Sequence, residues 1–246
     1  MEKQRFRALI EYDGTQYFGF QRQRADQVTI QGALETALRT VTGEPAAILA
    51  AGRTDSGVHA SGQVVCFDLT WRHGVDALQR ALNVNLPADI VVKRLEVTHA
   101  AFHPRFDARR RSYRYQIYNE PVRSPAHRLY SWHVSQPLDM AQMNEAAAHL
   151  IGVHDFATFG QPPQGTNTVR EVFQAEWRRE ADLLTFTIEA NAFLYQMVRS
   201  LVGSLKLVGE GKWTVATFVT ALHGCDRKYI TTVAPPHGLF LVSVTY

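Results

Sequence analysis

Cysteine is scarce in this chain of 246 residues: only Cys66 and Cys225 occur, and they stand far apart in the sequence. Neither belongs to a CxxC pair or to a His-rich cluster, so we expect two reduced, unreactive thiols and neither a disulfide framework nor a zinc site. Long apolar runs are missing too, since no window approaches the roughly 18 uncharged apolar residues of a membrane-spanning helix. The first residues, MEKQRFRALIEYDG, carry charges where a secretory signal has its apolar core. We therefore expect a cytoplasmic protein with no membrane partner.

The glycine patterns of dinucleotide and triphosphate sites, GxGxxG and GxxxxGK[ST], do not occur, so we expect no such cofactor. Lysine is rare as well: 21 of the 26 basic residues are arginine, although the net charge is only +3. Because the planar guanidinium recognises phosphate well, this bias is typical of a nucleic-acid partner. A GC-rich genome produces the same bias without any functional cause.

The distribution of the arginines favours the nucleic-acid interpretation. Seven of them occur from His103 to Arg128, beside only two acidic residues, Asp107 and Glu120. The seven are Arg105, Arg109, Arg110, Arg111, Arg114, Arg123 and Arg128. Phe106, Tyr113, Tyr115 and Tyr118 alternate with them. A basic run that carries aromatic residues can bind phosphates and stack bases, whereas the alternative is an ordinary solvated strand.

Apolar spacing predicts an α+β fold in two halves. In the first half we expect strands at 5–12, 46–51, 62–69 and 90–97 and helices at 28–41 and 74–84. Their β-α-β-β-α-β order is the split βαβ pattern of a ferredoxin-like sheet with helices on one face. In the second half we expect strands at 110–119, 129–134, 170–178, 183–190 and 238–246. We also expect three helices: one that starts at an Asp139 cap and ends at a Gly152 cap, and two more at about 194–208 and 214–222.

Residues that carry chemistry concentrate in the stretch Ala51–Val65, AGRTDSGVHASGQVV, between two apolar runs. The connection is longer than the roughly two to five residues of a hairpin loop, and long loops on a rigid scaffold often hold functional sites. Arg53 and Asp55 are two residues apart, so on extended backbone they point the same way, and the guanidinium favours the ionised carboxylate. Such a carboxylate serves as a nucleophile, a base or a stabilising anion. Alternatively, Asp55 caps a turn and Arg53 is its surface ion-pair partner.

A metal site would have to combine Asp55 with His59, His99 and His103. The four-residue spacing of His99 and His103 is useful only on a helix, and Pro104 forces His103 toward extended backbone. We therefore expect no metal. The pair Asp13-Gly14 predicts a turn.

Taken together, the motifs resemble the TruA family of tRNA pseudouridine synthases. The match is carried by GRTDxGVH at 52–59 and by EYDGTxYxGxQxQ at 11–23. Shorter matches follow in one order along nearly the whole chain, at 85–90, 102–105, 113–115, 154–156, 191–193, 197–203 and 234–239.

The resemblance implies an isomerase that converts uridine to pseudouridine at positions 38, 39 and 40 of the tRNA anticodon stem-loop, as a homodimer without metal or cofactor. It implies two ferredoxin-like halves with a catalytic cleft between them: residues 1–104 with the catalytic loop, and residues 105–246 with the RNA-binding arginines and a cleft wall. The site residues it implies are Asp55 as the catalytic carboxylate, Arg53 to hold the nucleotide out of its stem, Tyr113 against the target base and Arg199 as the partner of the carboxylate.

Two rival interpretations come from other functional classes. A non-catalytic RNA-binding module explains the strands, arginines and tyrosines but not the Arg-Thr-Asp loop. A metal-dependent nuclease would use Asp55 with the histidines and would lose activity in EDTA. Strand alternation alone does not distinguish Tyr113 from Tyr115, because both point to the same face.

Overall fold

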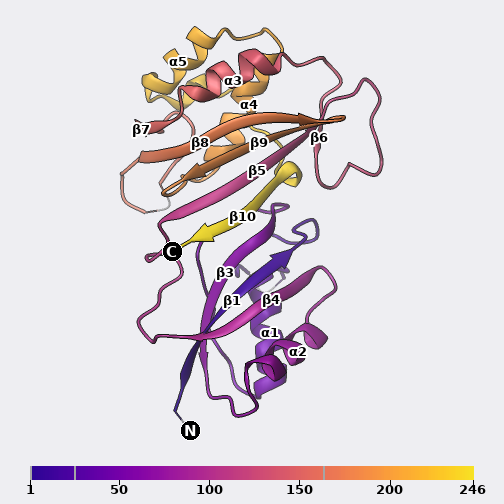
Figure 1. Cartoon of the computed structure of the whole chain (residues 1–246), viewed down its shortest axis with the longest axis vertical. Coiled ribbons are helices and arrows are strands. Elements are labelled where there is room, and N and C mark those ends of the chain that lie inside the picture. The colour runs from indigo at the N-terminus through magenta and orange to yellow at the C-terminus, as the bar shows by residue number, and fades with distance from the viewer. Residues whose placement is uncertain (1, 25, 163) are drawn as a thin grey trace. The chain divides into compact units, whose positions relative to one another are not determined.

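The computed structural model of the chain describes residues 2–24, 26–162 and 164–246, and it shows a mixed α/β fold (Figure 1). The described part of the chain contains five α-helices, none of which is long and apolar enough to cross a membrane. Contacts between residues divide the chain into two compact units. Unit 1 consists of Met1–Arg109 and Leu241–Tyr246, and unit 2 of Arg110–Phe240.

Unit 1 has the β-α-β-β-α-β order that the sequence predicts. Its elements are β1 (Gln4–Tyr12), α1 (Ile30–Thr42), β2 (Leu49–Ala50), β3 (His59–Leu69), α2 (Val75–Asn85) and β4 (Ile90–Thr98), followed much later by most of β10 (Leu239–Thr245). Strand β1 lies between β3 and β4 and is antiparallel to both, with Phe6 opposite Phe67 and Val97. The short strand β2 is antiparallel to β3, and β10 also lies next to β3.

Two strand boundaries in unit 1 differ from the prediction. Strand β3 begins at His59 instead of residue 62, because Ala60 still pairs with Tyr12 of β1 beyond a shift in register. Strand β2 covers only two residues of the predicted 46–51. The loop between β2 and β3 is therefore residues 51–58, which is shorter than the sequence suggested.

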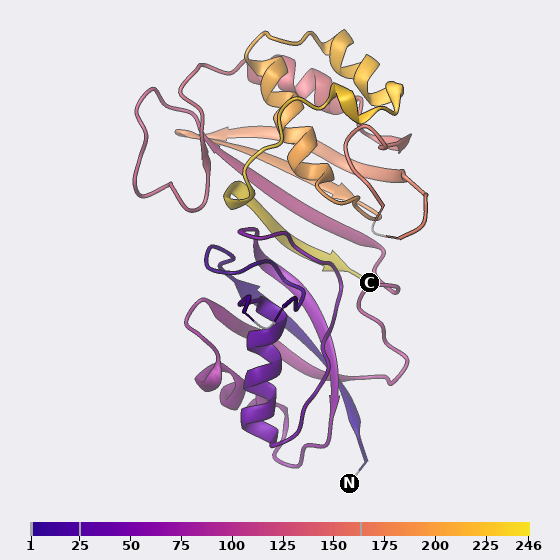
Figure 2. The same ribbon diagram turned by 180° about the vertical axis from the view of Figure 1, so that it is seen from behind.

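The core of unit 1 follows from the alternation of β1 and from the helix caps. Phe6, Ala8 and Ile10 are buried on one face of β1, and α1 and α2 lie on one side of the strands (Figure 2). Thr29 caps the start of helix α1, and its Oγ1 accepts the N–H of Gly32 at 3.2 Å. The helix ends at Gly43, which has a φ of 76° and therefore allows the chain to turn away.

Unit 2 contains a set of mostly antiparallel strands and three helices. Its elements are β5 (Arg110–Tyr118), β6 (Trp132–His133), α3 (Met140–Ala148), β7 (Gly152–Asp155), β8 (Val169–Glu180), β9 (Leu183–Ala190), α4 (Met197–Gly209), α5 (Val215–Gly224) and two 3₁₀ turns (Arg227–Tyr229 and Pro236–Gly238). The strand order is β5-β9-β8-β7, and β6 pairs in parallel with β5. Helix α4 is buried along most of its length, and α3 and α5 pack against it.

Three details of unit 2 correct the prediction. The strand expected at 129–134 is only the two residues of β6. Gly152 does not cap α3, whose C-cap is His149, but begins β7. Helix α4 begins at Met197 and not at residue 194, because Gln196 adopts a left-handed backbone with a φ of 60°.

Both thiols are free. Cys66 is 1% exposed on β3, and burial raises the pKa of its thiol to about 11. Loss of solvation also raises the pKa of the exposed Cys225 thiol. Since the thiolate is the reactive form, both shifts agree with the expectation of unreactive cysteines.

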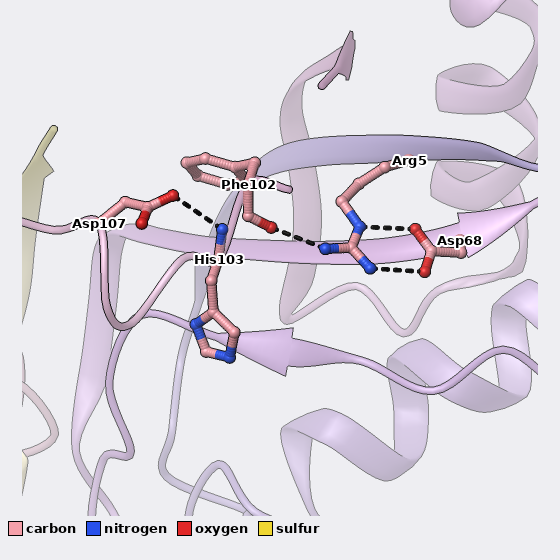
Figure 3. Close-up of polar contacts among 5 residues, drawn as sticks. All are labelled: Arg5, Asp68, Phe102, His103 and Asp107. Carbon is pink, nitrogen blue, oxygen red and sulfur yellow. Dashed lines mark hydrogen bonds and ion pairs between the residues drawn. The ribbon is translucent and has the colours of Figure 1, made fainter. Parts of the chain in front are cut away.

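An ion pair joins two strands of unit 1 to the segment that follows β4. Arg5 on β1 lies opposite Asp68 on β3, and two hydrogen bonds of 2.7 Å connect the guanidinium to the carboxylate (Figure 3). Nη1 of Arg5 also donates to the carbonyl of Phe102 at 2.9 Å. The side-chain hydrogen bond from Arg5 holds the pKa of Asp68 below its usual value. We call Arg5, Asp68 and the Phe102 carbonyl the Arg5 clamp.

We expect the substitution Asp68→Asn to lower the Tm by a few degrees at pH 7 and by less in acid. Because the pKa of Asp68 is lower in the folded than in the unfolded chain, the ionised pair stabilises the fold above the unfolded value of about 3.9. This contribution is lost as the pH falls through the lower folded value. Thermal unfolding followed by circular dichroism from pH 7 to about pH 3 measures the effect.

The control for this experiment is Glu96→Gln, which removes the more exposed Arg7–Glu96 pair. We expect it to change the Tm less at pH 7, because exposed pairs contribute little. A Tm difference for Asp68→Asn that stays constant across the pH range would contradict the role assigned to the carboxylate.

Candidate active site

The loop at residues 51–58, here called the RTD loop, holds Arg53 and Asp55 in unit 1. Thr54 is buried, whereas Arg53 is exposed and Asp55 is half-buried, as expected for alternation along an extended stretch. The Thr54 hydroxyl is hydrogen-bonded to the hydroxyl of Tyr12 at 2.8 Å. Gln63 donates through Nε2 to the carbonyl of Gly52 at 2.8 Å, and the N–H of Val58 donates to the carbonyl of Asp55 at 3.1 Å. The backbone on both sides of Asp55 is therefore held in place.

A second loop, residues 13–20, packs along the RTD loop and is called the support loop. The N–H of Phe20 donates to the carbonyl of Thr54 at 3.0 Å, and the carbonyl of Tyr17 accepts the N–H of Gly57 at 3.3 Å. A Cβ added to Gly14 would lie only 2.1 Å from the carbonyl oxygen of Val58. The two backbones therefore touch at Gly14. The sequence predicts this glycine only as part of a turn, and it also allows the close contact between the loops.

Two side chains hold the support loop, Tyr17 near its middle and His59 at its start. Tyr17 donates its hydroxyl to Asp89, and burial together with this bond raises the pKa of Tyr17 well above its usual value. His59 is 1% exposed, and its Nδ1 accepts the N–H of Gly14 at 3.0 Å and lies 3.1 Å from a carboxylate oxygen of Asp13. His59 thus connects the start of β3 to the support loop.

Two of the histidines considered for a metal site, His59 and His103, accept hydrogen bonds from backbone N–H groups. Nδ1 of His103 accepts the N–H groups of Arg105 and Phe106, at 3.2 and 3.3 Å. Throughout residues 2–24, 26–162 and 164–246, no group of three or more His, Cys, Asp or Glu side chains is arranged to hold a metal ion.

Tyr113 and Tyr115 have different surroundings on β5 in unit 2. Tyr115 is fully buried and donates its hydroxyl to the carbonyl of Pro235 at 2.9 Å, and the backbone at Gly238 packs against its ring. Tyr113 is 8% exposed and meets the ring of Phe193 edge to face, with centroids 5.0 Å apart. Tyr115 is therefore a core residue, whereas Tyr113, which is also largely buried, stays the residue predicted to lie against the base.

Arg199 lies in the first turn of α4 and is half-buried. Its Nε donates to the carbonyl of Ala234 at 2.7 Å, and the N–H of Ala234 donates back to the carbonyl of Arg199 at 3.0 Å. The reciprocal pair fixes one edge of the guanidinium. Arg199 and Tyr113 belong to unit 2, whereas Arg53 and Asp55 belong to unit 1.

The arginine-rich stretch divides into structural and exposed members. Arg111 is buried and donates to the carbonyl of Asn191 at 2.8 Å, and the guanidinium of Arg114 lies 4.8 Å from the ring centroid of Phe240. Arg110 is exposed but pairs with Glu189 at 2.8 Å. The other exposed members are Arg109, Arg123 and Arg128. Only part of the stretch is thus available to a large polyanion.

The chain is similar in sequence to known proteins. A family model described as tRNA pseudouridine synthase matches residues 8–107 and 146–246. A protein named tRNA pseudouridine synthase A from Sinorhizobium medicae (strain WSM419) is 45% identical over 248 residues, covering 98% of this chain and 99% of that protein. A protein of the same name from Thermoanaerobacter sp. (strain X514) is 41% identical over 239 residues, covering 97% and 98%. A solved Cbf5-Nop10-Gar1 complex is 12% identical, covers 82% of this chain and 54% of its own, and has a TM-score of 0.33.

The contact between the two loops predicts that Gly14→Ala destabilises the protein. Because the new methyl group would meet a backbone oxygen, the loops must separate, which costs about 1–3 kcal/mol and lowers the Tm by roughly 2–12 °C. Gly74→Ala serves for comparison: Gly74 has a φ of 80° and no atom within 4 Å of an added Cβ, so this variant reports the cost of a left-handed alanine without a steric contact. Thermal unfolding compares the two. An equal Tm for Gly14→Ala and the unchanged chain would show that the loops are not in contact.

Proposed function

Because the chain belongs to the tRNA pseudouridine synthase family, we propose that it isomerises uridine to pseudouridine at positions 38, 39 and 40 of the tRNA anticodon stem-loop, with Asp55 as the catalytic residue and no cofactor. The observation that carries the assignment of Asp55 is the RTD loop. Its backbone is hydrogen-bonded on both sides of Asp55 while the carboxylate remains partly accessible. Such fixed presentation is what a group that reacts with a bound nucleotide requires.

The reaction breaks the C1′–N1 bond of uridine, turns the released uracil, and joins C1′ to C5. The bonding electrons leave with N1, the C5 proton is lost after the new bond forms, and N1 takes up a proton, so atoms are conserved and no oxidant or reductant is consumed. Asp55 can begin the reaction in two ways: its carboxylate attacks C1′ to form a covalent sugar adduct, or it removes the C2′ proton to form a glycal. Both routes need an ionised carboxylate and retention of the detached base.

Tyr113 is the proposed surface for the target base. Extruding a stem nucleotide costs a few kcal/mol, and stacking of the extruded base on an aromatic ring stabilises it by about 1–3 kcal/mol. The edge-to-face contact with Phe193 restricts the ring of Tyr113, so little side-chain entropy remains to be lost on binding. Arg53 is proposed to hold the extruded nucleotide, and Arg199 to partner the carboxylate of Asp55.

The proposal extends to the arrangement of the whole protein. We propose ferredoxin-like halves at residues 1–104 and 105–246 with the catalytic cleft between them, supported by the β-α-β-β-α-β order of unit 1. A homodimer that works in the cytoplasm is proposed from the resemblance to the TruA family alone.

Substitution of the carboxylate tests the reaction. We expect the unchanged chain to form pseudouridine in an unmodified tRNA transcript both with and without EDTA, and Asp55→Asn to be slower by about 100-fold or more. Asp76→Asn, which alters an exposed carboxylate in the first turn of α2, is the control and should keep full activity. Pseudouridine and strand breaks are measured together. Strand cleavage that EDTA abolishes would instead identify a nuclease, and tRNA binding without pseudouridine would identify a binding module.

Salt dependence tests the exposed arginines. We expect the affinity for tRNA to fall with rising salt, because phosphate contacts release counterions. Arg123→Gln and Arg128→Gln should each lower the slope of log affinity against log salt by about one. Arg72→Gln, an exposed arginine outside the stretch, serves as the control. Affinity that is the same at low and high salt would exclude phosphate binding by these residues.

A further inference from the structure

The segment Phe102–Asp107, between β4 and β5, presents an aromatic side chain that the proposed reaction does not use. Phe106 is 73% exposed, and it lies at the surface of unit 1. A single exposed apolar residue is ordinary on protein surfaces, so exposure alone carries no conclusion. What distinguishes this segment, here called the Phe106 loop, is how firmly it is held and what surrounds the ring.

The beginning of the Phe106 loop is anchored in the unit. Phe102 is 4% exposed and packs against the ring of Tyr246, with centroids 5.0 Å apart, and edge to face against His99. Its carbonyl is part of the Arg5 clamp: it accepts a hydrogen bond from the guanidinium of Arg5, which Asp68 orients (Figure 3). The hydroxyl of Tyr246 donates to the carbonyl of Pro104 at 3.0 Å.

Hydrogen bonds also hold the backbone N–H groups of the loop itself. Oδ2 of Asp107 accepts a hydrogen bond from the N–H of His103 at 2.9 Å, as Figure 3 shows. In turn, the N–H of Asp107 donates to the carbonyl of His103 at 3.0 Å. Nδ1 of His103 accepts the N–H groups of Arg105 and Phe106. The loop therefore holds Phe106 at the surface in one backbone conformation, and binding there loses little conformational entropy.

The neighbours of the ring indicate the chemistry of its ligand. The imidazole of His103 lies 4.2 Å from the Phe106 ring, centroid to centroid, and the guanidinium of Arg105 lies 5.6 Å from the same centroid. The only acidic residue of the loop, Asp107, is engaged by the N–H of His103. A flat apolar face beside the guanidinium of Arg105 fits a planar aromatic ligand that carries a negative charge nearby.

We propose that Phe106 stacks on an unpaired nucleobase of tRNA, with Arg105 directed toward the adjoining phosphate, as a contact separate from the uridine that reacts. The inference rests on the proposed function, which makes tRNA the ligand. An unpaired base fits because the faces of paired bases are covered by their own stack. A nucleic acid is favoured over a protein partner because the function proposed above already supplies tRNA as a ligand.

The test measures tRNA affinity in an Asp55→Asn background, in which we expect turnover to be slow. Phe106→Leu keeps an apolar side chain but removes the aromatic face, and we expect it to weaken binding by about fivefold or more. Phe106→Trp should bind as tightly as the parent. Val84→Ala, at another exposed apolar side chain of unit 1, should change nothing. Because Phe106 is uncharged, the salt slope should stay the same in Phe106→Leu.

Equal affinity of the Phe106→Leu and parent chains for tRNA would overturn the inference, as would a loss that occurs only together with a lowered Tm. A change of oligomeric state without a change of affinity would also overturn it and would indicate a protein interface. Pseudouridine formation by the unchanged chain is assayed alongside. Its absence contradicts the proposed function, whereas its presence with unchanged Phe106→Leu affinity contradicts the stacking contact alone.

Discussion

The direct contact between two backbones in unit 1 is the constraint on which the position of Asp55 depends. Gly14 lies so close to the carbonyl of Val58 that no other side chain fits there, and hydrogen bonds from Phe20 and to Tyr17 continue the contact on either side. A reacting group has to be placed within about 0.5 Å, and long side chains with several rotamers achieve this poorly. Backbone atoms have no rotamers, so a loop bonded through them fixes the point from which the side chain of Asp55 extends.

Much of the architecture could be predicted from the sequence because its causes are local. The turn at Gly43 and the apolar alternation of β1 each act over a few residues, whereas the cap at Thr29 places the start of α1 two residues after the predicted one. The start of β3 at His59 could not be predicted, because it depends on pairing with Tyr12 across a shifted register. Gln196 likewise moves the start of α4 through a left-handed backbone for which the side chain gives no signal.

The site residues show the same division between local and distant causes. The Arg-Thr-Asp sequence and its glycines drew attention to Asp55, but they gave no indication of Gln63 or Tyr12, which hold the loop through side-chain bonds. Tyr113 and Tyr115 are equivalent in the strand pattern. They differ because the Tyr115 hydroxyl reaches a carbonyl 120 residues further along the chain.

Unit 1 is discontinuous, and this affects how it is made. Residues Leu241–Tyr246 belong to unit 1 but follow all of unit 2 in the sequence. Tyr246 covers Phe102, and Val242 lies against Gly62 of β3. At about 5–20 residues per second, the ribosome needs roughly 7–26 s to synthesise Arg110–Phe240 before these residues emerge. During that interval β3 lacks its neighbour β10, and an unpaired strand edge can pair with neighbouring chains.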